Sequence, residues 1–223
     1  MSKALVLLSG GMDSCTCAAI AKENHDEVHA LNVFYGQRHA VEIESAKQIT
    51  KALELDSYTE LDLSDTFKNF KSALVLNAGI EVDDNQDKNS VGATYVPARN
   101  SILLSAAAGF ADSKGYDVVY YGAHAEDHNS YPDCRPEYFY AMKEALRLGT
   151  DRGVVIEAPF IELHKSDIAK IGTELNVPFG LTHSCYRGER PACGTCPTCV
   201  VRLEAFKEAG LVDPLNYATD LNA

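Results

Sequence analysis

The residues that could do chemistry gather in two places, one at the start of the chain and one near its end. At the start stands the run Ser9-Gly10-Gly11-Met12-Asp13-Ser14. Two glycines let the backbone turn tightly and approach a ligand closely. Backbone N–H groups at the start of a helix attract phosphate, and a carboxylate can help to hold its metal ion. The alternative is an ordinary strand–turn–helix corner with an Asp or Ser cap.

Near the end, four cysteines follow the spacing C-x7-C-x2-C-x2-C: Cys185, Cys193, Cys196 and Cys199. Two-residue gaps let successive thiolates converge through tight turns, which Gly194 and Pro197 favour here. Four thiolates in a tetrahedron suit Zn²⁺ and leave no position for a substrate water, so the sequence predicts a structural zinc. Iron–sulfur ligation and redox thiols are the alternatives. His183 could replace one ligand, but Cys185 fits the spacing better.

Alternating strands and helices are needed to position these residues. Apolar residues 4–8 precede the glycines as a buried strand, and residues 15–22 follow as a helix. Further strands are predicted at 28–34, 58–63, 117–122 and 154–160, and further helices at 40–55, 102–111, 137–148, 167–175 and 200–209. This alternation predicts an α/β fold with a parallel sheet. Ligands of such sheets bind beyond the carboxyl ends of the strands, so the loops after the first two strands should share one cleft.

Polar loops supply further candidates for this cleft. Tyr35-Gly36-Gln37-Arg38-His39 ends the second strand, and Val96-Pro97-Ala98-Arg99-Asn100 precedes a helix. Pro97 blocks helix before it and Asn100 or Ser101 can cap the helix after it, which leaves Arg99 at its mouth. Arginine forks in such loops match carboxylates and phosphates. The acidic, aperiodic residues 78–92 are either a lid or plain surface disorder.

The whole chain bounds these predictions. Its 223 residues suffice for one α/β domain, residues 1–223, which includes a zinc-binding segment at 183–202. A net charge of −12 argues against a large nucleic-acid surface, but not against a small anionic ligand. No apolar run approaches a membrane span and no signal peptide is recognisable, so we expect a cytoplasmic protein that binds no membrane. In that compartment we expect no disulfide framework among the seven cysteines.

Residues 9–14 resemble the pyrophosphate loop (PP loop) of ATP pyrophosphatases, which cleave ATP between the α and β phosphates. Together with the motifs at 35–39, 96–100 and 122–136 and the four cysteines, they make nearly the full length similar to the 7-cyano-7-deazaguanine synthase family of queuosine biosynthesis. The resemblance implies a Rossmann-like fold of the adenine nucleotide alpha hydrolase type, a homodimer, one structural Zn²⁺ and Mg²⁺ with ATP. It also implies a ligase that converts 7-carboxy-7-deazaguanine and ammonia to the 7-cyano base, using two ATP and releasing AMP and pyrophosphate.

The same resemblance implies roles for individual residues. ATP binding is expected at Leu8, Ser9, Gly10, Gly11, Met12, Asp13, Ser14, Cys15, Thr16, Cys17 and Ala18. Catalytic roles are expected for Asp13, Ser14, Arg38, Arg99 and Lys165. Substrate contacts are expected from Tyr35, Gln37, Arg38, Asn100, Asp127 and Asp133. Within these sets, Arg38 or Arg99 would pair with the substrate carboxylate, Asp127 or Asp133 would accept the N–H groups of a guanine-like edge, and Lys165 would contact phosphate. For each the alternative is a loop salt bridge or a helix cap.

Other functions use the same loop. A tRNA-thiolating enzyme would need a basic RNA surface and sulfur-carrying cysteines, against which the charge and the cysteine quartet count. Amide-forming synthetases usually draw ammonia from a glutaminase unit, for which this chain has no room. A nucleotide-binding zinc module without catalysis would release no pyrophosphate.

Overall fold

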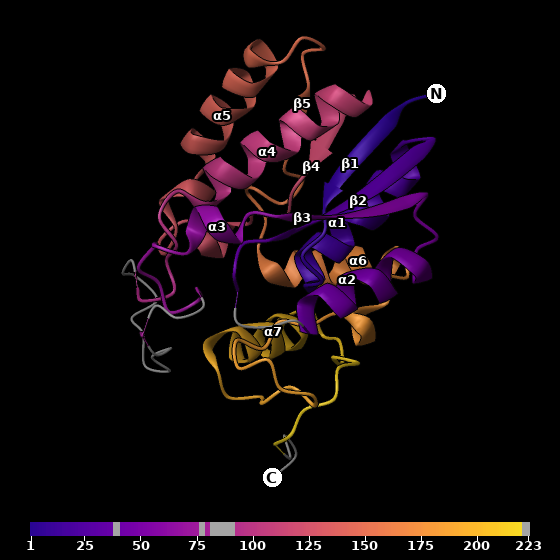
Figure 1. Ribbon diagram of the computed structural model, residues 1–223. Helices are drawn as coiled ribbons and strands as arrows, with labels where there is room; N and C mark the ends of the chain where they lie inside the picture. Colours follow the sequence, from indigo (N-terminus) through magenta and orange to yellow (C-terminus); the bar gives the residue numbers. More distant parts are fainter. Residues whose placement is uncertain (38–40, 76–78, 81–91, 220–223) are drawn as a thin grey trace.

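The computed structural model describes residues 1–37, 41–75, 79–80 and 92–219 (Figure 1). Arg38 and residues 78 and 81–91 of the predicted lid lie outside the described residues. Five parallel strands form one sheet in the order β3-β2-β1-β4-β5. The strands are β1 (Lys3–Leu7), β2 (Glu27–Phe34), β3 (Ser57–Asp62), β4 (Val118–Tyr120) and β5 (Val155–Glu157). The helices are α1 (Met12–Asn24), α2 (Val41–Ala52), α3 (Ser64–Phe67), α4 (Arg99–Lys114), α5 (Pro136–Gly149), α6 (Lys165–Glu174) and α7 (Pro197–Glu208).

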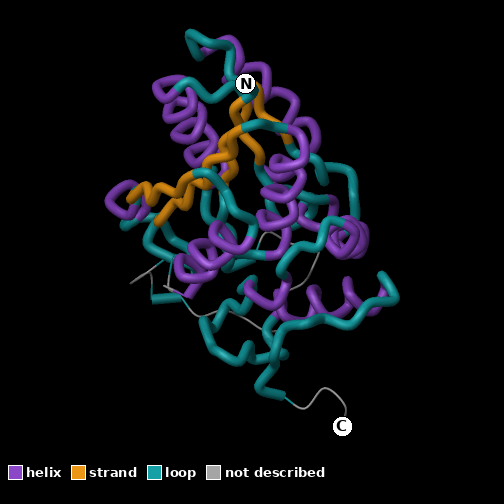
Figure 2. The backbone as a smooth tube through the Cα atoms, turned by 90° about the vertical axis from the view of Figure 1, so that its right-hand side faces the viewer, coloured by secondary structure: helices purple, strands orange, loops and turns teal. Residues whose placement is uncertain are grey.

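The helices cover both faces of the sheet, as the edge-on view in Figure 2 shows. Strand side chains alternate between the faces: Ala4 and Val6 pack with α1, α2 and α6, whereas Leu5 packs with α4 and α5. A parallel sheet is stable only when both of its faces are buried, and here both are. The predicted Rossmann-like α/β class is therefore confirmed.

The strand order places a switch point beside β1. The chain runs from β1 outward to β2 and β3, then returns to the other side of β1 to form β4 and β5. The loops that leave β1 and β4 therefore diverge to opposite sides, which opens a crevice at their carboxyl ends. The crevice lies where Ser9-Gly10-Gly11 leaves β1 and where Gly122 follows β4.

Two local predictions need correction. The short helix α3 was not expected, because four residues carry too little periodicity to be recognised. Helix α4 begins at Arg99, so Asn100 and Ser101 lie in its first turn and do not cap it. Its capping oxygen comes instead from a distant loop, because the backbone N–H of Asn100 donates to Asp133 Oδ2 at 2.8 Å.

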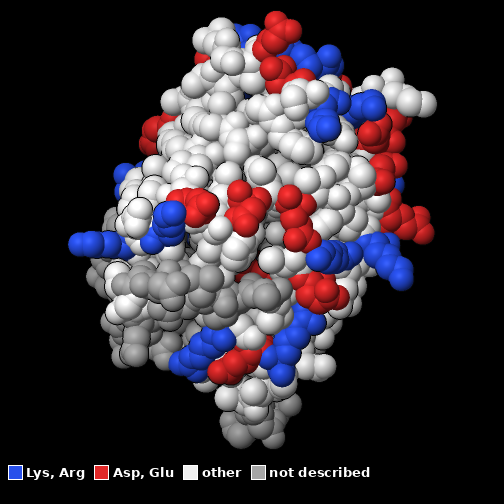
Figure 3. Space-filling view, in the orientation of Figure 1, with Lys and Arg blue, Asp and Glu red and all other residues white. Residues whose placement is uncertain are grey.

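Among the described residues, no helix combines the length and apolar character that a membrane crossing requires. On the face seen in Figure 3, basic and acidic side chains are interspersed, with no broad basic field. This face lacks the single-sign basic surface that a nucleic-acid partner would need.

Candidate active site

The PP loop, residues 9–14, joins β1 to α1 at the switch point. Gly10 has a φ of +97°, and a Cβ there would come within 2.4 Å of the carbonyl oxygen of Glu42, so only glycine fits. The hydroxyls of Ser9 and Ser14 lie 3.0 Å apart, and the Gly11 N–H donates to Ser9 Oγ at 3.3 Å. These hydroxyls and the N–H groups at the start of α1 form a cradle suited to a phosphate.

Asp13 lies at the centre of the cradle. Its Oδ2 accepts from Lys165 Nζ at 2.9 Å and lies 3.8 Å from His124 Nε2, while its Oδ1 is buried with no hydrogen-bond partner among the described residues. Burial raises the pKa of Asp13, but the charges of Lys165 and His124 outweigh it and hold the pKa below its ordinary value. An ionised carboxylate with one free buried oxygen fits a Mg²⁺ ligand.

Glu126 holds Lys165 and His124 in place beside Asp13. Its Oε1 accepts from the backbone N–H of Lys165 at 2.8 Å, and its Oε2 lies 3.1 Å from His124 Nδ1. Burial opposes ionisation of Glu126, yet the hydrogen bonds from His124 and Lys165 lower its pKa to about 2. Glu126 therefore sets the direction in which Lys165 and His124 face the PP loop.

A cavity of about 310 Å³, the first cavity, opens over this cradle. The predicted residues that line it are Leu8, Ser9, Gly11, Asp13, Ser14, Tyr35, Gln37, Arg99, Asn100, Asp127 and Lys165. Met12, Cys15, Thr16, Cys17 and Ala18 are buried in the core and do not appear in its wall. The fold thus places most of the predicted site residues in the wall of one cavity.

Arg99 enters the first cavity from the start of α4. Its guanidinium carbon lies 5.6 Å from the ring centre of Tyr35 and 5.9 Å from that of Tyr131, and its Nη1 donates to the Tyr35 hydroxyl at 3.3 Å. Burial disfavours its charge, but the surrounding tyrosine oxygens raise the pKa of Arg99 and keep it protonated. Aromatic stacking leaves the planar fork oriented for an anion.

Asn100 and Asp133 are paired with each other. Asp133 Oδ2 caps α4 through the backbone of Asn100, and Asn100 Nδ2 donates to the Asp133 carbonyl at 3.3 Å and to Cys134 Sγ at 3.1 Å. Asp133 is absent from the wall of the first cavity, whereas Asp127 lines it and lies 3.4 Å from His124 Nε2. Of the two expected base-reading carboxylates, only Asp127 faces the cavity.

Glu42 also lines the first cavity but was not predicted. Burial raises its pKa to about 7, which the charge of Arg99 only partly counters. In the sequence Glu42 is one of two acidic residues at the start of an amphipathic helix. Only the packing of α2 on Gly10 brings it to the cleft.

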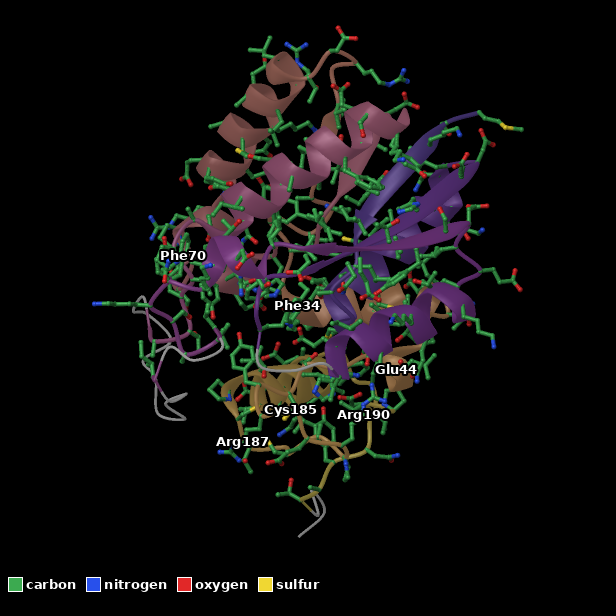
Figure 4. All side chains as sticks on the ribbon, in the orientation of Figure 1. Phe34, Glu44, Phe70, Cys185, Arg187 and Arg190 are labelled. Carbon is green, nitrogen blue, oxygen red and sulfur yellow. The ribbon has the colours of Figure 1, made fainter. Side chains whose placement is uncertain are left out.

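The four cysteine sulfurs lie within 4.8 Å of one another, and all four cysteines are buried. His183 is not part of this group. The backbone N–H of Cys196 points at Cys193 Sγ at 3.3 Å, as expected for a thiolate in a tight turn. Four convergent sulfurs fit a tetrahedral zinc site, which would be structural because all four ligands come from the protein. In Figure 4 Cys185 lies beside α7, away from the sheet, and Arg190 reaches α2, where it donates to Ser45 Oγ.

Arg202 connects this cysteine segment, residues 183–202, to the PP loop. It is fully buried on α7, pairs with Asp213 at 2.7 Å, and donates to Thr182 Oγ1. His183, which follows Thr182 in the chain, donates its backbone N–H to the Gly10 carbonyl at 2.8 Å. No sequence pattern predicts this role, because an arginine on a terminal helix is usually solvated.

The family model described as "Queuosine biosynthesis protein QueC" matches residues 3–210. The chain belongs to this family. Similar proteins include the 7-cyano-7-deazaguanine synthase of Thermoplasma volcanium, which is 47% identical over 97% of this chain and 91% of that protein. That of Oceanobacillus iheyensis is 42% identical over 96% of this chain and 98% of that protein.

Among solved structures, the NMN synthetase of Francisella tularensis matches with a TM-score of 0.50 and 15% identity, over 95% of this chain and 73% of that one. At this identity the likeness concerns the fold alone. It agrees with the α/β arrangement described for this QueC-family chain.

Proposed function

We propose that the protein is an ATP-dependent ligase that converts 7-carboxy-7-deazaguanine and ammonia to 7-cyano-7-deazaguanine, with release of AMP and pyrophosphate. The observation that carries the proposal is the pairing of Asp13 with Lys165 at the mouth of the PP loop. This arrangement suits the β and γ phosphates of ATP and leaves the α-phosphate exposed to a second substrate. Family membership supports the same reaction.

The first step activates a poor electrophile. A carboxylate oxygen of the acid attacks the α-phosphorus, the bond to the β-phosphate oxygen breaks, and pyrophosphate leaves with the electron pair. Ser9, Ser14 and the loop amides hold the leaving diphosphate, and Lys165 transfers its contact from Asp13 to phosphate. Mg²⁺, held by Asp13, would supply further charge neutralisation when it is bound.

Ammonia then attacks the acyl carbon, and the bond to AMP breaks to give an amide. A second adenylation occurs on the amide oxygen. Loss of that oxygen with AMP and of the two N–H protons leaves the nitrile. This sequence needs no nucleophilic side chain, so positioning and electrostatics suffice.

Substrate contacts follow the same logic. We place the acid's carboxylate at Arg99, with Arg38 as the alternative, and its guanine-like edge at Asp127. Tyr35 and Gln37 hold the loop beside Arg99: Gln37 Oε1 accepts the Tyr35 N–H at 2.8 Å. Asn100 and Asp133 would contribute indirectly, because their hydrogen bonds hold the start of α4, from which Arg99 enters the cavity.

Several finer predictions accompany this function. The cysteine segment would bind one structural zinc as part of a single domain spanning residues 1–223. We also expect a cytoplasmic protein and, from the family resemblance, a homodimer. No nucleic acid or membrane is expected as a partner.

The test is turnover with ¹⁵N-ammonium, Mg²⁺-ATP and 7-carboxy-7-deazaguanine, followed by mass spectrometry. We expect a nitrile that carries ¹⁵N, with AMP and pyrophosphate formed only when the acid is present. ATP cleavage that ignores the acid would contradict the proposal. A nucleotide-binding zinc module would release no pyrophosphate under any of these conditions.

A further inference from the structure

A second cavity, of about 600 Å³, adjoins the first. Six residues line both cavities, so these residues form a shared wall: His124, Asp127, Tyr131, Lys165, Tyr186 and Thr198. The rest of the second cavity is lined by residues in and just after the η1 turn at Ala125–Asp127, by residues of α7, and by Thr94, His164 and Thr195. The function proposed above places the guanine-like edge at Asp127, on this shared wall, but does not say which of the two cavities holds the base.

The chemistry of the first cavity suits the nucleotide. The PP loop occupies one part of its wall, and the apolar side chains of Leu31, Val33 and Leu74 occupy another. A phosphate cradle next to an apolar surface matches the two ends of ATP, since the flat adenine ring gains by burial against apolar side chains.

The second cavity offers different groups. Tyr131 and Tyr186 stand on the shared wall with their hydroxyls 3.4 Å apart. Aromatic side chains stack on planar rings. Asp127, on the same wall, is acceptor-only when ionised and can receive two parallel N–H bonds. Asn129 and Ser130 add polar groups beside it.

The reaction requires two sites in contact. The attacking carboxylate oxygen and the α-phosphorus must come within about 3–3.5 Å of each other. The acid must therefore bind in a pocket that is in direct contact with the ATP site. A shared wall that includes Lys165 and Arg99's partner Tyr131 meets this requirement. A planar acid in the second cavity could direct its carboxylate across that wall while ATP fills the first.

We propose that the second cavity binds the planar, guanine-like base of the acid substrate, stacked on Tyr131 and Tyr186 with its donor edge on Asp127. This inference rests on the proposed function and adds the division of labour between the cavities. Arg99, oriented by Tyr131, would then receive the carboxylate at the junction.

Val201 and Leu203 provide a matched pair for the test. Both are half-buried on α7, but only Val201 lines the second cavity, and the two residues point in different directions because they are two positions apart. Val201→Trp fills the cavity, so we expect the KM for the acid to rise at least about 10-fold. The Kd of a non-hydrolysable ATP analogue should change less than 2-fold, as should both constants in Leu203→Trp.

A second pair of variants keeps the test valid if Val201→Trp does not fold. Glu204 and Lys207 are both exposed on α7, and only Glu204 lines the second cavity. Glu204→Trp should raise the KM for the acid, whereas Lys207→Trp should not. Binding of the ATP analogue and the melting temperature report whether each variant is folded.

The outcomes separate the subsite from the reaction. If wild-type protein makes the nitrile but both cavity variants keep the KM for the acid, the base does not lie in the second cavity. A rise confined to the KM for ammonium would make the cavity an ammonia passage, and a rise confined to ATP would make it a nucleotide site; either result overturns the proposal. If wild-type protein forms no AMP and no nitrile, the proposed function itself fails.

Discussion

Lys165 Nζ lies 2.9 Å from Asp13 Oδ2, which ties the starts of two helices, 152 residues apart in sequence, across the PP loop. Burial disfavours the charge on each partner, and their mutual attraction restores it: the pKa of Lys165 is raised and that of Asp13 lowered. The pair therefore keeps a positive and a negative side chain in contact at the PP loop, where each can change its partner when a ligand binds. In the proposed reaction, Lys165 would bind a phosphate of ATP and Asp13 would bind Mg²⁺.

Asp13→Asn tests this pair. The variant keeps the shape but removes the negative charge, so the partly buried Lys165 loses its hydrogen-bonded counter-ion. We expect kcat to fall at least about 100-fold and the free energy of unfolding to fall by about 1–3 kcal/mol. Pyrophosphate release and urea denaturation measure the two effects. Asp151→Asn, at an exposed position, is the control and should change neither.

Arg99→Lys and Arg99→Ala test the carboxylate contact. Lysine keeps the charge but loses the planar fork, so we expect the KM for the acid to rise about 10-fold in Arg99→Lys and more in Arg99→Ala. The KM for ATP should stay near its original value. Arg147→Ala, which removes an exposed arginine paired with Glu144, is the control. Unchanged steady-state constants in Arg99→Ala would remove this residue from the site.

Cys193→Ser tests the zinc prediction. Native mass spectrometry should find one zinc per chain in the unaltered protein and less in this variant. Because the cysteine segment positions His183 against Gly10, zinc loss should also raise the KM for ATP. Cys17→Ala, at a buried cysteine outside the quartet, should retain the metal. Zinc retained fully by Cys193→Ser would rule out this ligand set.

Glu42→Gln tests the raised pKa of a cavity carboxyl. The folded-state pKa of Glu42 is about 7, above its usual value of 4.5, so the unfolded chain loses its proton first as the pH rises. The free energy of unfolding therefore falls as the pH rises from about 4.5 to about 7, and the loss remains above that pH. At pH 8 the loss is on the order of 1–3 kcal/mol. Denaturation of the ligand-free protein at pH 5 and pH 8 should show Glu42→Gln gaining stability over wild type only at the higher pH. Equal differences at both pH values would contradict the assignment.

Local signals explain why much of the fold could be predicted. The apolar run of β1 followed by Ser9-Gly10-Gly11 carries its own periodicity and turn chemistry, and the cysteine spacing specifies a convergent site. The elements placed from such signals agree with the structure to within a few residues, apart from α3.

Long-range contacts explain what could not be predicted. Asp133 caps α4 from 33 residues away, and Arg202 is buried because Asp213 and Thr182 meet it in space. Glu42 reads as a surface glutamate until α2 packs on Gly10. None of these partners is marked by spacing in the sequence, so only the fold reveals them.

The central claim is that the substrate carboxylate attacks the α-phosphate of ATP. The most direct measurement uses 7-carboxy-7-deazaguanine with ¹⁸O in both carboxylate oxygens and follows the label by mass spectrometry. The account predicts that each AMP released carries one ¹⁸O and that pyrophosphate carries none. Label in the inorganic products, or ADP in place of AMP, would contradict it.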